Sequence, residues 1–508
     1  MMGTKERRFA PLANPSLDDL VPAEHFYRHL ERTLDLTFVR DLVRDRYAAG
    51  GRPSVDPVVF FKLQLVMFFE GLRSERQLMQ VVADRLSLRW YLGYDLGEPL
   101  PDHSSLTRVR DRYGLTVFRR FFDEVVAQCQ TAGLVWGGEL YIDATKVAAN
   151  ASVDSVLPRF AVEAHVGGLF AAGDDPDDRG DGPDGLGGTP SPLPAALTGA
   201  AQAELAAAAA GRHDWLGEAG RPDRDVVRGR YRRTADFRAS ATDPDASLMR
   251  HRAGGLDLGY QDHYVVDGGK ARTILVTLAA PAEVQENQPA LDLLWRSCFR
   301  WKVWPRQVSG DTTYGTRQII VALEDAGIRA FVPLPDFDHR TPYFGRGHFV
   351  YDPAADAYRC PRGQDLPFRQ RRIAERIRLY QAPAAVCNAC PRKGDCTGSD
   401  HGRQIRRSED EAYLDRVRGY HATEPYRKAM RKRQVWVEPL FAEAKAWHGL
   451  RRFRLRGLPK VNAEALLIAA GQNLKRLLSW RGWGRRPWPS GAPGLVLPLP
   501  SAVVAVLP

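Results

Sequence analysis

The sequence predicts a mixed α/β protein, in which a sheet with flanking helices follows an all-helical amino-terminal domain. Between Leu17 and Gly133 the apolar residues recur at helical spacing, and capping residues separate the runs. From Glu139 onward the pattern changes to short apolar strands, in the order three strands, a helix, a strand and further helices. That order is typical of a mixed sheet whose faces are covered by helices.

The composition indicates a polyanionic partner. The 508 residues suffice for two or three domains with a well-buried core. Lys and Arg number 72 against 61 acids, a net charge of +11. Between Tyr426 and Arg456 stand ten Lys or Arg and two Glu, so the excess is locally concentrated. No run of 18 apolar residues occurs and the amino terminus lacks a signal peptide's apolar core, which predicts a cytoplasmic protein without a membrane partner.

Three acidic residues stand in a suggestive order. Asp143 lies on an apolar strand after the turn at Gly137 and Gly138. Asp311 ends a later strand, before a predicted helix at 318–326, and Glu438 follows on a basic helix. Each Asp alone is a weak signal, because strand ends often carry a solvated or capping Asp. The combination of the three is much stronger.

The stretch from Lys432 to Leu458 is predicted to be an amphipathic helix that runs into an arginine-rich tail. Glu438 and Lys445 are seven residues apart, close to two helical turns, so both project from nearly the same side. Glu443 is five residues from Glu438 and points elsewhere, so Glu438 is favoured as the third acid. The residues expected to pack on a core recur near helical spacing: Val435, Leu440, Phe441 and Ala444.

These residues suit phosphodiester chemistry. Transfer of a DNA phosphodiester needs a nucleophilic oxygen, stabilisation of the charged transition state and help for the departing 3′ oxygen. Two divalent ions about 3.5–4 Å apart can supply all three. Mg²⁺ takes oxygen ligands and keeps waters, so Asp143, Asp311 and Glu438 would suffice to bind Mg²⁺ or Mn²⁺. Lys445 would contact a phosphate.

At these residues the chain resembles the DDE transposases of bacterial insertion sequences. The matching stretches are YIDATKVAANAS around Asp143, D-x-x-Y-G from Asp311 to Gly315, E-x6-K from Glu438 to Lys445, SVDPVVFFKLQLV and PDHSSLTRVRDR. The resemblance covers most of residues 15–480. It implies an RNase-H-like catalytic domain that cuts the element ends and joins them to target double-stranded DNA, acting as a homo-oligomer.

The residues before Glu438 depart from the pattern of the family. Related transposases often carry an Arg four residues and a Tyr seven residues before the Glu. Here Gln434 and Arg431 stand at those places, with Arg433 as the nearest substitute. The DNA role of this flank therefore rests on Arg433, whereas Arg451 and Arg452 are expected to add non-specific backbone affinity.

The expected domains follow from these patterns. Arg108 and Arg112, in the stretch Asp102–Arg112, suit a helix whose amino-terminal end meets DNA phosphates. The alternative is a helical bundle with a solvated arginine face. The predicted parts are a flexible tail at 1–16, a helical DNA-binding domain at 17–133, an RNase-H-like catalytic domain at 134–482 with a low-complexity insertion at 154–230 and a cysteine-containing insertion at 340–405, and a flexible tail at 483–508.

Four of the six cysteines cluster in the second insertion: Cys360, Cys387, Cys390 and Cys396. Four thiolates match a closed tetrahedral structural Zn²⁺ site, and the C-x2-C pair has the usual spacing. The other pair is irregular, so His348 and His401 are possible substitutes for a missing ligand. The alternative is four reduced cysteines in a loop-rich insertion.

Three functions remain open at the level of sequence. A transposase that cleaves and joins is favoured. A metal-dependent nuclease without joining needs the same carboxylates. A catalytically dead DNA-binding regulator derived from a transposase would be favoured by loss of an acid, but all three acids and Lys445 are present.

Overall fold

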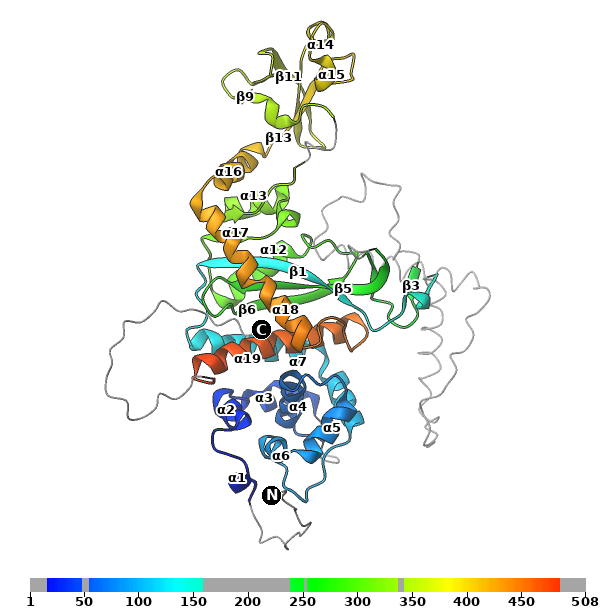
Figure 1. Cartoon of the computed structure of the whole chain (residues 1–508), viewed down its shortest axis with the longest axis vertical. Helices are drawn as coiled ribbons and strands as arrows, with labels where there is room; N and C mark the ends of the chain where they lie inside the picture. Colours follow the sequence, from blue (N-terminus) through cyan, green and yellow to red (C-terminus); the bar gives the residue numbers. More distant parts are fainter. Residues whose placement is uncertain (1–15, 48–53, 159–237, 251–253, 337–341, 485–508) are drawn as a thin grey trace, which may run out of the picture.

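The computed structural model describes residues 16–47, 54–158, 238–250, 254–336 and 342–484. Nearly all of the predicted tails, and most of the predicted insertion at 154–230, lie outside these residues. Figure 1 shows three levels along the longest axis: amino-terminal helices, a central sheet with its own helices, and a small module of strands at the far end.

The amino-terminal part is helical, as predicted, and its helices begin at capping residues. Asp56 accepts a hydrogen bond from the amide of Val58, and Ser74 and Asp102 cap later helices in the same way. The helices are α1 (Leu17–Leu20), α2 (Phe26–Thr33), α3 (Phe38–Val43), α4 (Pro57–Phe69), α5 (Glu75–Asp84), α6 (Leu86–Leu92) and α7 (His103–Thr131), with a short 3₁₀ turn η1 (Arg44–Arg46). Gly114, at φ 63°, kinks α7.

These helices share one continuous hydrophobic core with the sheet. α7 packs along α19 (Leu458–Trp480), the long helix that closes the chain's described part. Gly471 of α19 lies directly against the ring of Phe68, where a Cβ would come within 2.6 Å of the ring carbons. The Cys129 thiol donates to the carbonyl of Asn473 at 3.8 Å. The helical part is therefore packed onto the sheet part.

The central sheet is mixed, which confirms the predicted α/β class. Its strands are β1 (Glu139–Ala148), β4 (Ser247–Arg250), β5 (Leu256–Asp267), β6 (Ile274–Pro281), β7 (Gln307–Ser309) and β8 (Arg329–Phe331). The order is β4-β5-β1-β7-β8, and β6 also pairs with β5. β1 is antiparallel to β5 and parallel to β7, and β7 is parallel to β8, an RNase-H-like arrangement.

Helices flank this sheet. α12 (Ala290–Trp301) packs on β5 and β6, and α17 (Glu424–Trp436) packs on β7 and β8. The remaining elements of this part are α13 (Arg317–Asp325), α16 (Glu411–His421), α18 (Glu438–Trp447), the 3₁₀ turns η2 (Val153–Ser155) and η3 (Thr312–Tyr314), and the two-stranded pair β2 (Val156–Pro158) and β3 (Arg238–Ser240).

Two asparagines fasten α19 to the outer strand β6. Asn462 accepts a hydrogen bond from the amide of Ala279 and donates to its carbonyl, both at 2.9 Å. Asn473 does the same with Ile274, at 2.9 and 2.8 Å. Each side-chain amide thus satisfies one backbone donor and one backbone acceptor that would otherwise be buried without partners.

The cysteine-containing insertion forms a five-stranded antiparallel sheet with a separate small core. Its strands run in the order β13-β12-β11-β10-β9 and lie beyond α16 (Figure 1). The elements are η5 (Arg346–His348), β9 (Val350–Asp352), β10 (Ala357–Arg359), β11 (Asp365–Arg372), β12 (Ile377–Gln381), α14 (Ala384–Asn388), α15 (Lys393–Cys396) and β13 (Gln404–Ser408).

The predicted single helix from Lys432 is wrong in two respects. The chain forms two helices, α17 and α18, that meet at Val437, because Pro439 lacks the amide needed to continue the first helix. Leu440, Phe441 and Ala444 are buried as predicted, but Val435 lies before the break and is 55% exposed. Among the described helices, none combines the length and apolarity that a bilayer crossing needs.

Candidate functional site

The sheet register brings the first two acids side by side. β1 and β7 are parallel neighbours, and Tyr141 pairs with Ser309. Asp143 and Asp311 each stand two residues beyond this pair, so they occupy matching positions, Asp143 within β1 and Asp311 just after the end of β7. The Asp311 carboxylate caps η3, its Oδ1 accepting from the amide of Thr313 at 2.8 Å.

Glu438 and Asp143 contact the same arginine side chain. The guanidinium of Arg433 on α17 lies 3.2 Å from Asp143 Oδ2 and 3.5 Å from Glu438 Oε1. Glu438 opens α18, immediately after the break at Val437. The Asp143 and Arg433 side chains are only 11% and 15% exposed, whereas that of Glu438 is 55% exposed. One guanidinium therefore neutralises two carboxylates from different elements.

The electrostatics of Asp143 agree with a cluster of acids. Burial raises the pKa of Asp143 to about 6 although the charge of Arg433 and the amide of Ala144 oppose the shift. The charges of Asp311 and Glu438 raise this pKa further. An acid whose pKa is perturbed by burial and by other acids is typical of a functional site.

Lys445 contacts β1 two residues beyond Asp143. Its ammonium donates to Thr145 Oγ1 at 2.6 Å, and Thr145 stands two residues after Asp143 on the same side of β1. Glu438 and Lys445, seven residues apart on α18, thus both approach β1. Burial lowers the pKa of Lys445, as does the charge of Arg451.

Two functional candidates escaped the sequence analysis. Glu286 lies in the loop between β6 and α12, and burial together with the charges of Asp311 and Asp143 raises its pKa to about 7. The buried hydroxyl of Tyr314 has no hydrogen-bond partner among the described residues, and its pKa is raised by burial and by the charges of Asp143 and Glu286. Tyr314 belongs to the D-x-x-Y-G stretch, so a signal existed for it. For Glu286, an isolated glutamate in a loop, the sequence carries no such signal.

Glu443 has a structural place. It accepts hydrogen bonds from Gln472 at 3.1 Å, from Arg476 at 3.1 Å and from Lys475, all on α19. Asp262 is fully buried within β5 and accepts a hydrogen bond from the Thr277 hydroxyl at 2.9 Å. The pattern of the sequence could not distinguish a buried strand Asp from an edge one.

The donor chemistry at Asp143, Asp311 and Glu438 fits a hard divalent cation, since all three supply carboxylate oxygens. However, across the part of the chain that the structure describes, no three His, Cys, Asp or Glu side chains are gathered closely enough to hold a metal ion. Arg433 instead stands between Asp143 and Glu438. A metal ion could bind both carboxylates only after this guanidinium moved aside.

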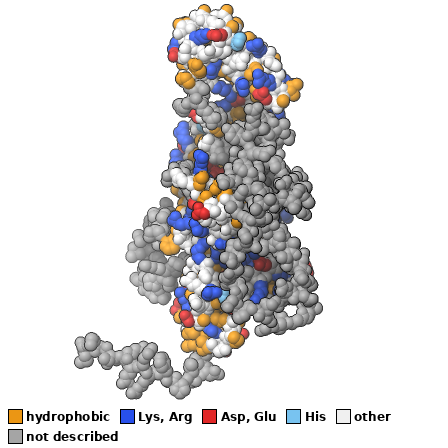
Figure 2. Space-filling model, turned by 90° about the vertical axis from the view of Figure 1, so that its right-hand side faces the viewer, with side chains coloured by type: hydrophobic (Ala, Val, Ile, Leu, Met, Phe, Trp, Pro, Cys, Tyr) orange, Lys and Arg blue, Asp and Glu red, His pale blue; other side chains and the backbone are white. Residues whose placement is uncertain are grey.

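The predicted DNA-binding arginines divide into exposed and buried groups. Arg108 and Arg112 lie exposed on α7, with Arg112 over the ring of Tyr47, and Arg451 and Arg452 are exposed beside β1. Arg110, between the first two, is buried and paired with Glu75. Figure 2 shows Lys and Arg side chains recurring along the described part of one face.

The four clustered cysteines line one cavity of about 180 Å³. The amide of Arg362 donates to Cys360 Sγ at 3.3 Å, and that of Arg403 donates to Cys387 Sγ at 3.4 Å. His348 and His401, the predicted substitutes, do not line this cavity. The thiols share a cavity without forming a closed ligand set among the described residues.

Two family models match the chain. Residues 15–112 match a family described as Transposase domain (DUF772), and residues 359–478 match one described as Transposase DDE domain. The second match spans Glu438 and Lys445. No curated protein matches the chain, and no solved structure matches it.

Together with the mixed sheet and its acids, these two matches support a DDE-type DNA transposase of insertion sequences. Transposases bind DNA, and DDE enzymes generally use divalent metal ions.

Proposed function

We propose that this transposase cleaves the ends of an insertion sequence and joins them to target DNA, with Asp143, Asp311 and Glu438 as its catalytic acids. The observation that carries the proposal is the meeting of Asp143 and Glu438 at one guanidinium, beside the strand end that carries Asp311. Three carboxylates from a central strand, its parallel neighbour and a basic helix could hold Mg²⁺ or Mn²⁺.

In the proposed reaction water attacks the phosphodiester at the element end, and the bond between phosphorus and the 3′ oxygen breaks. The freed 3′ hydroxyl then attacks a target phosphodiester by the same in-line displacement. A bound divalent ion would stabilise the charge that develops on the phosphate oxygens. Arg433, released from the acids, and Lys445 would hold phosphates, while Arg108, Arg112, Arg451 and Arg452 would bind the DNA backbone.

The test is a cleavage and joining assay on DNA from both flanks of the gene, with Mg²⁺ or with EDTA. Asp311→Asn and Glu438→Gln keep size but remove charge, and each should abolish both cutting and joining. Glu375→Gln is the matched control, because this residue lies at an exposed turn between β11 and β12 and, among the described residues, pairs with Arg372 on the surface. It should retain full activity.

The other outcomes identify the alternatives. Metal-dependent cuts without joined products would favour a nuclease. Tight binding of end DNA without cleavage under any metal would favour a regulator derived from a transposase. The proposal also includes action in the cytoplasm and assembly as a homo-oligomer on paired ends. Sedimentation with and without end DNA should show a larger assembly in its presence.

For the cysteines we propose a structural Zn²⁺ clip formed by Cys360, Cys387, Cys390 and Cys396. The support is their common cavity and the amide-to-sulfur hydrogen bonds at Cys360 and Cys387, which suit thiolates. Binding would require the side chains to turn toward one point in the cavity. Metal analysis should find one zinc per chain, lost in Cys387→Ser together with the stability of this module, and retained in Cys298→Ser, a control in α12.

A further inference from the structure

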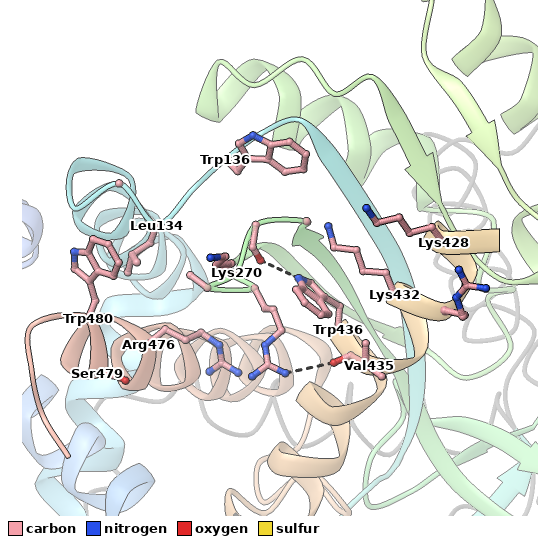
Figure 3. A pocket seen from close by; sticks show the side chains of 16 residues that line it. Leu134, Trp136, Lys270, Lys428, Lys432, Val435, Trp436, Arg476, Ser479 and Trp480 are labelled. Carbon is pink, nitrogen blue, oxygen red and sulfur yellow. Dashed lines mark hydrogen bonds between the residues drawn. The ribbon is translucent and has the colours of Figure 1, made fainter. Parts of the chain in front are cut away.

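A wide basic groove lies away from the acids, on the other side of α17. It has a volume of about 1040 Å³ and is bounded by the β5–β6 hairpin, α17 and the end of α19. Figure 3 shows Trp136, Trp436 and Trp480 distributed around it, with Lys428 and Lys432 extending from α17. The remaining basic residues that line it are Lys270, Arg272, Arg431 and Arg476, and none of the described acidic residues lines it.

Two of the tryptophans are more than half exposed. Trp136 is 59% exposed and Trp480 is 56% exposed, although each is a large apolar ring. Trp436 is fixed instead, because its indole donates to the carbonyl of Gly269 at 2.8 Å (Figure 3). Exposed rings beside cations, at the wall of a cavity, have the form of a surface on which a flat partner stacks.

The charge of the groove is only partly compensated. Lys432 pairs with Glu139 at 2.7 Å and also lies over the Trp136 ring at 5.4 Å. Arg431 pairs with Glu424 on the surface. Lys270 and Lys428 form no ion pair with a described residue. The groove therefore favours an anionic partner.

α17 connects this groove with the acids. Arg433 points from α17 to Asp143, whereas its neighbour Lys432 points to Glu139 at the groove. Glu139 and Asp143 are four residues apart on β1, so the two sites are separated by roughly 13 Å at ~3.3 Å per residue. One polymer strand can reach both.

We propose that this groove binds unpaired DNA, whose bases stack on Trp136 and Trp480 while Lys270 and Lys428 hold its phosphates. A flat base can stack on an exposed indole, and the phosphates supply the negative partners that Lys270 and Lys428 do not find among the described residues. Duplex DNA keeps its bases stacked inside and would leave both rings without a partner. The inference rests on the DNA activity proposed above, and assigns to it a site for a strand separated from its complement near the cut.

The test uses the full-length protein with Asp311→Asn, in EDTA, so that binding is measured without cleavage. The probes are a fluorescein-labelled oligo-dT strand and the same strand annealed to oligo-dA, followed by fluorescence anisotropy. A strand carrying 2-aminopurine reports stacking by quenching. The variant is Trp136→Ala with Trp480→Ala, and the matched control is Trp304→Ala, which is also 56% exposed but lies outside the groove.

The double variant should bind the single strand at least about 30-fold more weakly, because two stacked bases each lose an aromatic partner and each loss weakens binding at least about 5-fold. It should lose 2-aminopurine quenching and keep its affinity for the duplex. Trp304→Ala should match the parent, and circular dichroism should show the same fold for all three. Unchanged single-strand binding would overturn the proposal, and so would an equal loss for the duplex. Failure of the cleavage assay alone would overturn only the proposed function.

Discussion

Replacement of Arg433 by Met measures how much the ion pair between Arg433 and the acids contributes to the free energy of unfolding. Arg433 and Asp143 are both largely buried and 3.2 Å apart, so the change leaves a buried carboxylate without its partner. Loss of one member of a buried pair costs about 3–5 kcal/mol. Because Glu438 is half exposed, it adds little, and we expect about 3 kcal/mol. For a chain of this size that is a fall in melting temperature of about 3–6 °C.

The assay is thermal unfolding in EDTA and in a Mg²⁺ series. Mg²⁺ should raise the melting temperature of Arg433→Met more than that of the parent, because in the parent the ion must first displace the guanidinium. Arg431→Met is the control, since its pair with Glu424 is exposed and contributes about 0–1 kcal/mol. If Arg433→Met melts like this control and responds to Mg²⁺ like the parent, the inferred competition between Arg433 and metal is refuted.

Three further predictions concern single side chains. Burial tends to raise the pKa of Glu443, but its hydrogen bond with His448 and the charges of Arg476 and Lys475 lower it below the ordinary 4.5. The stabilisation by ionised Glu443 is therefore present above about pH 4.5 and is lost as the pH falls. In urea unfolding at pH 7, Glu443→Gln should be about 3 kcal/mol less stable than the parent, and this difference should become smaller in acid. A difference that stays constant with pH would contradict the prediction. The pKa of Glu286 is raised to about 7, so its ionised form destabilises the fold as the pH rises from 4.5 through 7. In EDTA at pH 8, Glu286→Gln should be more stable than the parent by about 1–2 kcal/mol, with no gain at pH 4.5, and an equal gain at both would point to packing instead. Lys445→Met should weaken end-DNA binding and reduce the salt slope by about one unit, measured by anisotropy, whereas an unchanged slope would limit Lys445 to its bond with Thr145.

The sequence predicts the fold well where periodicity and capping act together. Asp56, Ser74 and Asp102 mark the starts of three helices. The break at Val437 was missed, because the apolar spacing from Val435 to Ala444 continues across Pro439 when spacing alone is counted. The attachment of the amino-terminal helices to α19 was also beyond prediction, since it depends on contacts between residues several hundred positions apart.

The site was predictable as a set of residue types and positions, and less so as a geometry. Asp143, Asp311 and Glu438 are recognisable by strand ends and helix spacing, and their roles remain predictions that the assays above test. Arg433 was expected to bind DNA, and the structure places it between two of the acids. Glu286 reaches the cluster from a loop, where no period indicates direction.

The paired asparagines of α19 have a consequence for how the chain tolerates change. Asn462 and Asn473 are eleven residues apart on a helix, which spans roughly 16 Å at ~1.5 Å per residue. Ala279 and Ile274 are five residues apart on a strand, which spans roughly 16 Å at ~3.3 Å per residue. Because the two lengths agree, both asparagines can hydrogen-bond to the strand at the same time. A one-residue deletion between the two asparagines, or between Ile274 and Ala279, would break the hydrogen bonds of one asparagine. It would also expose the outer edge of β6, and exposed strand edges promote aggregation between chains.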